Sequence, residues 1–272
     1  MKKGITIAIL NNNKPLANHF CSEHGLSVWV QIGNTTFLLD TGQTDKYLRN
    51  AQTLGIDLRC VDAIVLSHGH YDHAGGLAYF PQTTKQIPLY AGSNVQQVRY
   101  SYSSLMLKPN GFPQPECLKH FCYKTINGIF RLNEHITLFT LPTPAPPNNK
   151  LVVRAPSGSL VPDAFSDELF ALISNESATI LLGGCTHHGI EQLLLFCKKE
   201  LNISHLTAFV GGLHLSGQPM DTVQHIAQTV ANLMQIDHWI VNHCTGDEAI
   251  TYWQQHFGAT PTQGYAGSII TF

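Results

Sequence analysis

Charged side chains are scarce in this sequence. Asp, Glu, Lys and Arg make up 12% of the 272 residues, and the net charge is only −2. Because there is no basic excess to hold a nucleic acid backbone, we expect no nucleic acid partner. Apolar residues reach 43%, which excludes a disordered chain and predicts a globular protein with a sizeable core.

Long apolar runs are absent as well. None reaches the roughly 18 residues that a membrane-spanning helix needs, so we expect no membrane partner. The segment Met1–Leu10 combines two lysines with an apolar run, but Asn11–Asn13 end that run and no small-residue cleavage site follows. We interpret it as a first strand rather than a signal peptide.

The sequence also lacks any pattern of paired cysteines. The seven cysteines are odd in number and scattered, and no two of them form a C-x-x-C pair. This excludes a disulfide framework and is typical of a reducing compartment, so we expect a cytoplasmic location.

Histidine, by contrast, is abundant at 15 residues, and Ser67–His73 reads Ser-His-Gly-His-Tyr-Asp-His. This segment follows the apolar run Val61–Leu66, which is typical of a buried strand. A strand that ends in clustered imidazoles and a carboxylate supports, on a rigid base, the ligands that divalent metal ions take from proteins.

The spacing within this segment predicts two neighbouring ions. His68 and His70 lie two residues apart on one side of an extended loop and are expected to hold one ion. Asp72 and His73 follow where the chain turns and are expected to hold the other. We expect zinc at both positions, with manganese or iron as alternatives.

Strand and helix patterns alternate along the chain. They predict a single domain over residues 1–272, with two β-rich halves at about 1–140 and 163–272, two packed sheets and helices outside. The expected strands lie at 4–10, 26–31, 35–39, 61–66, 89–91, 170–174, 179–183, 207–210, 239–241 and at the end of 258–272. The expected helices lie at 44–54, 189–201 and 221–234.

Two segments fit neither periodicity. Residues 92–115 are expected to be irregular, either a binding loop or an ordinary surface excursion. Arg99 lies among tyrosines in this segment, and we hypothesise that it contacts an anionic or aromatic substrate. The proline-rich stretch Pro142–Pro162 is expected to connect the two halves.

Further histidines and cysteines directly follow the later predicted strands. In α/β folds, sites form where the ends of several strands converge. His243 and His187 are expected as additional metal ligands. Cys185 is expected as a ligand or a bridging thiolate, with a packed strand-end residue as the alternative. His188 is expected to point away, since adjacent side chains on extended backbone diverge.

The roles of two further residues and one segment stay open at this point. His214 is a candidate general acid or substrate hydrogen-bonder, with a metal ligand or a structural residue as alternatives. Asp40 is expected to orient a ligand or to cap a turn. The segment Glu23–Gly25 is either part of the site mouth or a solvated loop.

Asp40, the H-x-H-x-D-H segment from His68 to His73 and the later histidines resemble the metallo-β-lactamase superfamily. The resemblance covers nearly the whole chain and implies a four-layer αββα sandwich that binds metal. One subgroup is similar over longer segments, and its members are labelled 7,8-dihydropterin-6-methyl-4-(β-D-ribofuranosyl)aminobenzene-5′-phosphate synthase-like or simply metal-dependent hydrolases. The similar segments are Asp40–Gln43, Leu66–Leu77, Gly184–Ile190, Gly211–Leu215 and His243–Gly246.

Two departures from the family pattern concern the ligands. Many relatives carry a third His in a His-Thr-Pro-Gly turn, whereas Leu141–Pro144 has none. Many also carry a bridging Asp where this chain has Cys185. The resemblance therefore implies that His187 takes the place of the missing His, and that Cys185 or a water bridges the ions.

The leading functional hypothesis is a metal-dependent hydrolase acting on a phosphoester or carbonyl substrate. Asp72 would position the hydroxide generated at the ions, and His214 would protonate the leaving group. The alternative is a transferase that joins a pterin pyrophosphate to an aminobenzene ribosyl phosphate. A third interpretation is a binding protein that keeps the metal without turnover. In each case we expect a small-molecule ligand, anionic or pterin-like, and the oligomeric state stays open.

Overall fold

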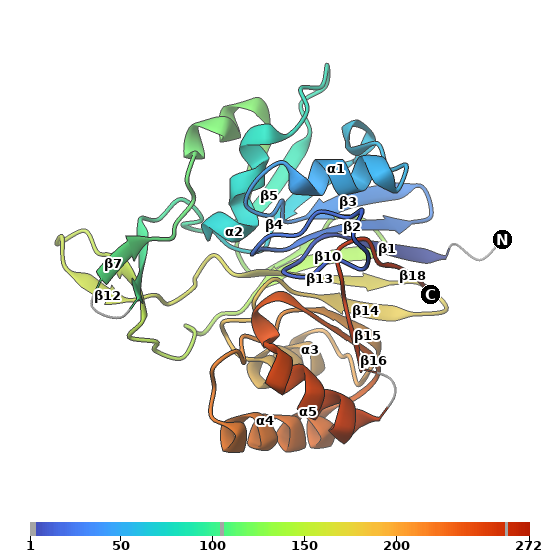
Figure 1. Cartoon of the computed structure of the whole chain (residues 1–272), viewed down its shortest axis with the longest axis vertical. Coiled ribbons are helices and arrows are strands. Elements are labelled where there is room, and N and C mark those ends of the chain that lie inside the picture. The colour runs from blue at the N-terminus through green and yellow to red at the C-terminus, as the bar shows by residue number, and fades with distance from the viewer. Residues whose placement is uncertain (1–3, 104–105, 259–260) are drawn as a thin grey trace.

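Two seven-stranded sheets face each other in the computed structural model, which describes residues 4–103, 106–258 and 261–272. The strand orders are β18-β1-β2-β3-β4-β5-β8 and β17-β16-β15-β14-β13-β10-β9. Helix α1 covers the outer face of the first sheet, and α3, α4 and α5 cover that of the second (Figure 1). The predicted four-layer αββα sandwich is confirmed.

The bounds of the elements are as follows. The first sheet contains β1 (Ile5–Asn11), β2 (Ser27–Ile32), β3 (Thr35–Leu39), β4 (Ala63–Leu66), β5 (Pro88–Gly92), β8 (Cys122–Ile126) and β18 (Ile269–Thr271). The second contains β9 (Ile129–Arg131), β10 (Ile136–Thr140), β13 (Leu169–Ser174), β14 (Thr179–Leu182), β15 (His205–Gly211), β16 (Gln235–Val241) and β17 (Pro261–Gln263). The α-helices are α1 (Lys46–Thr53), α2 (Tyr71–Ala74), α3 (Ile190–Glu200), α4 (Met220–Leu233) and α5 (Asp247–Phe257). None of the described helices combines the length and apolarity that crossing a bilayer requires.

The central strands are apolar throughout because both of their faces are buried. In β4, Ala63 and Val65 join the core between the two sheets, while Ile64 and Leu66 pack into the core beneath α1. Side chains of a strand alternate between the faces of its sheet, so a strand covered on both sides reads as a continuous apolar run. The strand that supports the His-rich segment is therefore buried, as predicted.

The sequence prediction missed several elements of the two large layers. Strands β8, β9 and β10 were not expected, and the exposed residues of β9 explain why it lacks an alternating pattern. Helix α5 was missed although Ala249, Ile250 and Trp253 are buried at helical spacing. β9 and β10, which precede residue 141, belong to the second sheet, and β18 at the end of the chain belongs to the first. That one domain spans residues 1–272 stays a prediction.

A third, four-stranded sheet projects from one side of the sandwich (Figure 1). It has the order β12-β11-β6-β7 and contains β6 (Arg99–Ser103), β7 (Met106–Pro109), β11 (Leu151–Arg154) and β12 (Leu160–Pro162). The prediction of an irregular segment at 92–115 is therefore wrong where β6 and β7 lie; Ser104 and Leu105 lie outside the described residues. The segment Pro142–Pro162 is also more than a connection, since Val152 of β11 pairs with Tyr100 of β6.

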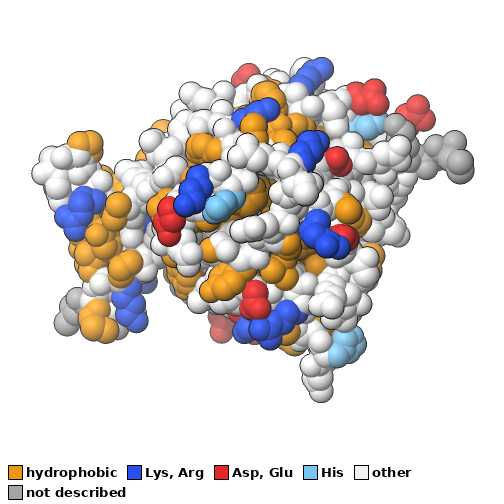
Figure 2. Space-filling view, turned by 90° about the horizontal axis from the view of Figure 1, so that it is seen from above, with side chains coloured by type: hydrophobic (Ala, Val, Ile, Leu, Met, Phe, Trp, Pro, Cys, Tyr) orange, Lys and Arg blue, Asp and Glu red, His pale blue; other side chains and the backbone are white. Residues whose placement is uncertain are grey.

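The surface of this third sheet carries exposed apolar side chains (Figure 2). They are Tyr102, Met106, Leu107 and Val161. Strands that leave apolar groups in water lack the clean alternation of a half-buried sheet, which is why sequence periodicity did not reveal them.

Arg99 joins the third sheet to the His-rich segment. Its guanidinium is buried and donates from Nε to Asp163 (2.7 Å) and from Nη2 to Asp167 (2.5 Å). The other oxygen of Asp167 accepts the backbone N–H of Gly69 at 2.8 Å. The hypothesis that Arg99 contacts a substrate is wrong, because its guanidinium is buried between these carboxylates.

We predict that Arg99→Leu destabilises the protein by about 3–5 kcal/mol, because it leaves two buried carboxylates without their counter-charge. Urea denaturation of wild type and variant measures the change. Arg59→Ala, which removes an exposed arginine from its pair with Asp57, is the matched control and should have no measurable effect. Equal free energies of unfolding for wild type and Arg99→Leu would contradict a stabilising role for this pair.

Candidate metal centre

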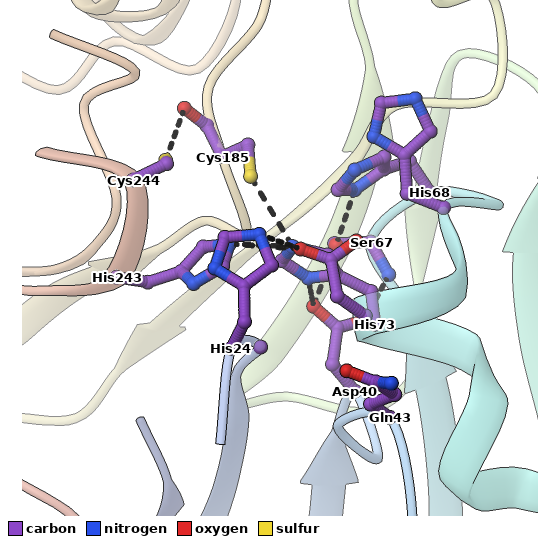
Figure 3. Close-up of polar contacts among 12 residues, drawn as sticks. His24, Asp40, Gln43, Ser67, His68, His73, Cys185, His243 and Cys244 are labelled. Carbon is purple, nitrogen blue, oxygen red and sulfur yellow. Dashed lines mark hydrogen bonds and ion pairs between the residues drawn. The ribbon is translucent and has the colours of Figure 1, made fainter. Parts of the chain in front are cut away.

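The predicted ligands meet at one end of the sandwich because they follow parallel strands. β3 runs parallel to β4, and β14, β15 and β16 are parallel to one another. The carboxyl ends of parallel strands lie at the same edge of a sheet. Figure 3 shows side chains from both sheets converging there.

The first group of candidate ligands is His68, His70 and His187. One ring nitrogen from each lies within 4.8 Å of the other two, and Nε2 of His187 is 3.3 Å from Nε2 of His68. The ring of Phe165 stacks on His187, with centroids 3.7 Å apart, and limits its orientation. These three imidazoles are arranged so that they could hold one ion.

The second group is Asp72, His73 and His243. Nε2 of His243 lies 3.2 Å from Nε2 of His73 and 3.3 Å from Oδ2 of Asp72. Cys185 Sγ is 3.2 Å from Nε2 of His73, and these two residues also form a group with His68. The thiol therefore lies between the two groups, where a bridging ligand would be. That these residues bind metal stays a prediction.

Four of the histidines are neutral and ready to coordinate. Burial lowers the pKa of His70 to about 3 and that of His243 to about 4. It also lowers the pKa values of His68 and His187 well below their usual range. A neutral imidazole has a free lone pair, which metal coordination requires.

His73 and Asp72 form the charged part of the centre. Burial alone would lower the pKa of His73, but the carboxylates of Asp40 and Asp72 raise it to about 9. Burial alone would raise the pKa of Asp72, yet the charge of His73 and hydrogen bonds from His24 and His243 hold it well below its usual value. A proton on His73 thus supplies positive charge at a position where a metal cation fits.

Buried acceptors determine which ring nitrogen faces the centre. Asp40 accepts the backbone N–H of Ser67 (2.7 Å), the Ser67 hydroxyl (2.6 Å) and Nδ1–H of His73 (2.7 Å). Because the Ser67 hydroxyl donates to Asp40, its oxygen accepts Nδ1–H of His68 at 2.9 Å. Both rings therefore direct Nε2 at the centre, and Asp40 orients His73 as expected.

Glu168 holds the turn that carries His187, and sequence reasoning missed it. Its carboxylate accepts the backbone N–H groups of His187 (2.6 Å) and His188 (2.9 Å). It also accepts Nδ1–H of His188 at 2.6 Å, and Nε2 of that ring contacts the carbonyl of Thr143 at 2.9 Å. His188 thus points away from the centre, as predicted. An acid directly before the apolar strand β13 was the available signal.

His214 lies beside the first group rather than within it. Its ring centroid is 4.3 Å from that of His187, and it belongs to none of the candidate ligand groups among the described residues. Its φ of 51° is left-handed, as are those of Asp40 and His243. Such strained backbone clusters at functional sites. The placement suits a residue that contacts a bound substrate.

His24 was not predicted as a ligand either. Its Nε2 lies 3.1 Å from Oδ2 of Asp72, and it forms a group with Asp72 and His243. The segment Glu23–Gly25 is thus part of the site mouth rather than a solvated loop. The segment contains a single histidine and no spacing typical of metal ligands. Only the contact of His24 with Asp72 in the folded protein places it at the centre.

Comparisons with known proteins agree with this geometry. Residues 23–161 match the family model described as the metallo-beta-lactamase superfamily. The chain is 26% identical to the 7,8-dihydropterin-6-methyl-4-(beta-D-ribofuranosyl)-aminobenzene-5'-phosphate synthase of Methanocaldococcus jannaschii, over 93% of this chain and 91% of that protein. It is 27% identical to an uncharacterised protein of the same organism, over 92% and 94%. A crystal structure described as a metal-dependent hydrolase of the beta-lactamase superfamily superposes with a TM-score of 0.84, 29% identity and 98% coverage of both chains.

We predict that Asp40→Asn weakens metal binding by about 10–100-fold, because the amide has one accepting oxygen and cannot accept both the backbone N–H of Ser67 and Nδ1–H of His73. Competition with a chromophoric chelator measures the affinity. Asp237→Asn, which alters an exposed His–Asp pair with His205, is the matched control and should bind metal like wild type. Unchanged affinity in Asp40→Asn would show that this carboxylate does not support the ligands.

Proposed function

Because the chain belongs to the metallo-β-lactamase superfamily, we propose that it is a metal-dependent enzyme that joins a pterin pyrophosphate to an aminobenzene ribosyl phosphate. The observation that carries this proposal is the similarity to the synthase of that product, which extends over 93% of the chain. In such a transfer the pterin methylene carbon loses pyrophosphate and forms a bond to the amino nitrogen of the acceptor.

The residues of the centre fit two divalent ions. His68, His70 and His187 would hold one. The carboxylate and imidazoles of the second group, whose ligand atoms lie 3.2–3.8 Å apart, would hold the other, with Cys185 between them. Bound there, the ions would stabilise the negative charge that develops on the departing pyrophosphate. Imidazole and thiolate ligands favour zinc over magnesium, which prefers oxygen.

His214 would act on the substrates themselves. His214 lies beside His187 and is only partly buried, so its imidazole can reach a bound molecule. There it would accept the proton that the acceptor amine loses when the new bond forms. Phe165 stacks on His187 with ring centroids 3.7 Å apart and covers one face of that imidazole.

A metal-dependent hydrolase is the second candidate. Its support is the 29% identical crystal structure described as such an enzyme, which matches 98% of the chain. In that reaction Asp72 would orient the attacking water, and His214 would protonate the leaving group of a phosphoester or carbonyl substrate. The two functions use the same residues and differ in the acceptor.

We predict that product formation depends on the acceptor. Metal-loaded protein given both substrates should release pyrophosphate and the joined product in equal amounts, which chromatography with mass spectrometry measures. With the pterin pyrophosphate alone, release should be small. Rapid release of pyrophosphate and the pterin alcohol without the acceptor would favour the hydrolase. If the metal-loaded protein turned over none of these substrates, it would be a binding protein.

We also predict that chelation abolishes turnover and that added zinc restores it. His243→Ala should lower turnover at least 100-fold, roughly the loss expected when charge stabilisation in a transition state is removed. Its control is His256→Ala, which removes an exposed imidazole at the end of α5 and should leave turnover unchanged. Full activity of chelated protein or of His243→Ala would exclude the proposed metal dependence.

A further inference from the structure

The segment Glu23–Gly25 brings one more imidazole to the mouth of the second group. Nε2 of His24 lies 3.1 Å from Oδ2 of Asp72, and its ring centroid is 4.9 Å from that of His243. Figure 3 shows the His24 and His243 rings next to each other. The His24 side chain is 55% exposed, whereas that of Asp72 is 8% exposed, so His24 is the solvent-facing member of the trio.

Glu23 fixes the segment on one side. Its carboxylate accepts the backbone N–H groups of Gln43 (2.9 Å) and Thr44 (2.8 Å) and the Thr44 hydroxyl (2.7 Å). These residues directly precede α1, whose position is set by core packing. The backbone before His24 is therefore anchored to the first sheet layer.

Gly25 fixes the segment on the other side. At its φ of 140°, a Cβ would overlap the backbone carbonyl oxygen of Asp72, so only glycine allows this close approach. The backbone N–H of Leu26 donates to that carbonyl at 3.2 Å. The side-chain oxygen of Asn13 accepts the N–H of Gly25 (3.2 Å) and lies 2.9 Å from Nδ1 of His243. The segment is thus tied to both other members of the trio.

We propose that His24 is a ligand of the second ion, together with Asp72 and His243. Their ligand atoms lie within 4.8 Å of one another. Without a cation, the imidazole nitrogens of His24 and His243 hydrogen-bond the carboxylate of Asp72. A cation among them would be held by the lone pairs of the same atoms. Because His24 faces solvent, it is the ligand that an anionic oxygen of the substrate can displace.

This inference rests on the proposed metal dependence, and its test separates the two. Zinc content by mass spectrometry and affinity by chelator competition are measured on wild type, His24→Ala and His24→Gln. The first ion should bind all three proteins equally. The second should bind both variants more than about 100-fold more weakly, since loss of an outer hydrogen-bond partner alone costs 10–100-fold.

The two variants distinguish ligation from hydrogen bonding. Glutamine can donate to Asp72 but has no imidazole lone pair, so wild-type affinity in His24→Gln with weak binding in His24→Ala would overturn the ligand role. Wild-type affinity in both variants would overturn it as well. His205→Ala, from an exposed pair with Asp237, is the matched control and should bind two ions. A wild-type protein that binds no zinc would instead overturn the metal dependence.

Discussion

The buried carboxylate of Asp40 is the constraint on which the centre depends. It lies at the end of β3, where its backbone N–H donates to Val65 of the neighbouring strand at 2.9 Å. Its side chain holds Ser67 at the beginning of the His-rich segment and His73 at its end. A buried charge is tolerated only when it is paired and hydrogen-bonded, so the segment cannot relax without leaving this charge unsatisfied. The hydrogen bonds of Asp40 to Ser67 and His73 therefore also set the positions of His68 and His70, which lie between them in the chain.

Two other buried acids also hold ligand-bearing segments in place by hydrogen bonds. Asp167 ties Gly69, in the middle of the segment, to Arg99 of the third sheet. Glu168, the next residue in the chain, ties the turn of His187 to the start of β13. Adjacent residues thus connect the two ligand segments, which come from different sheets. Because each carboxylate is buried, the ligand geometry is linked to the packing of the whole sandwich.

The sequence predicts those parts of the molecule that local patterns specify. The apolar run of β4 and the spacing from His68 to His73 depend on neighbours within a few residues, so both could be predicted. The partners of Arg99 and His24 could not, because Asp167 and Asp72 lie 68 and 48 positions away. A buried arginine and a substrate-binding arginine look alike in sequence, since only tertiary packing decides whether a guanidinium meets water or carboxylates.

The charge balance of the centre bears on the substrate. Before any cation binds, the carboxylates of Asp40 and Asp72 face one protonated His73, and burial keeps the Cys185 thiol protonated by raising its pKa well above the usual value. Two divalent ions would displace both protons, since a coordinating thiol is deprotonated outright. Four positive charges would then face two carboxylates and one thiolate, which leaves the loaded centre positive. A positive, largely buried centre stabilises a departing pyrophosphate or phosphate more than a neutral leaving group. The transfer reaction and a phosphoester hydrolysis both release such an anionic group. Hydrolysis of a neutral carbonyl compound presents negative charge to the centre only once its oxyanion develops.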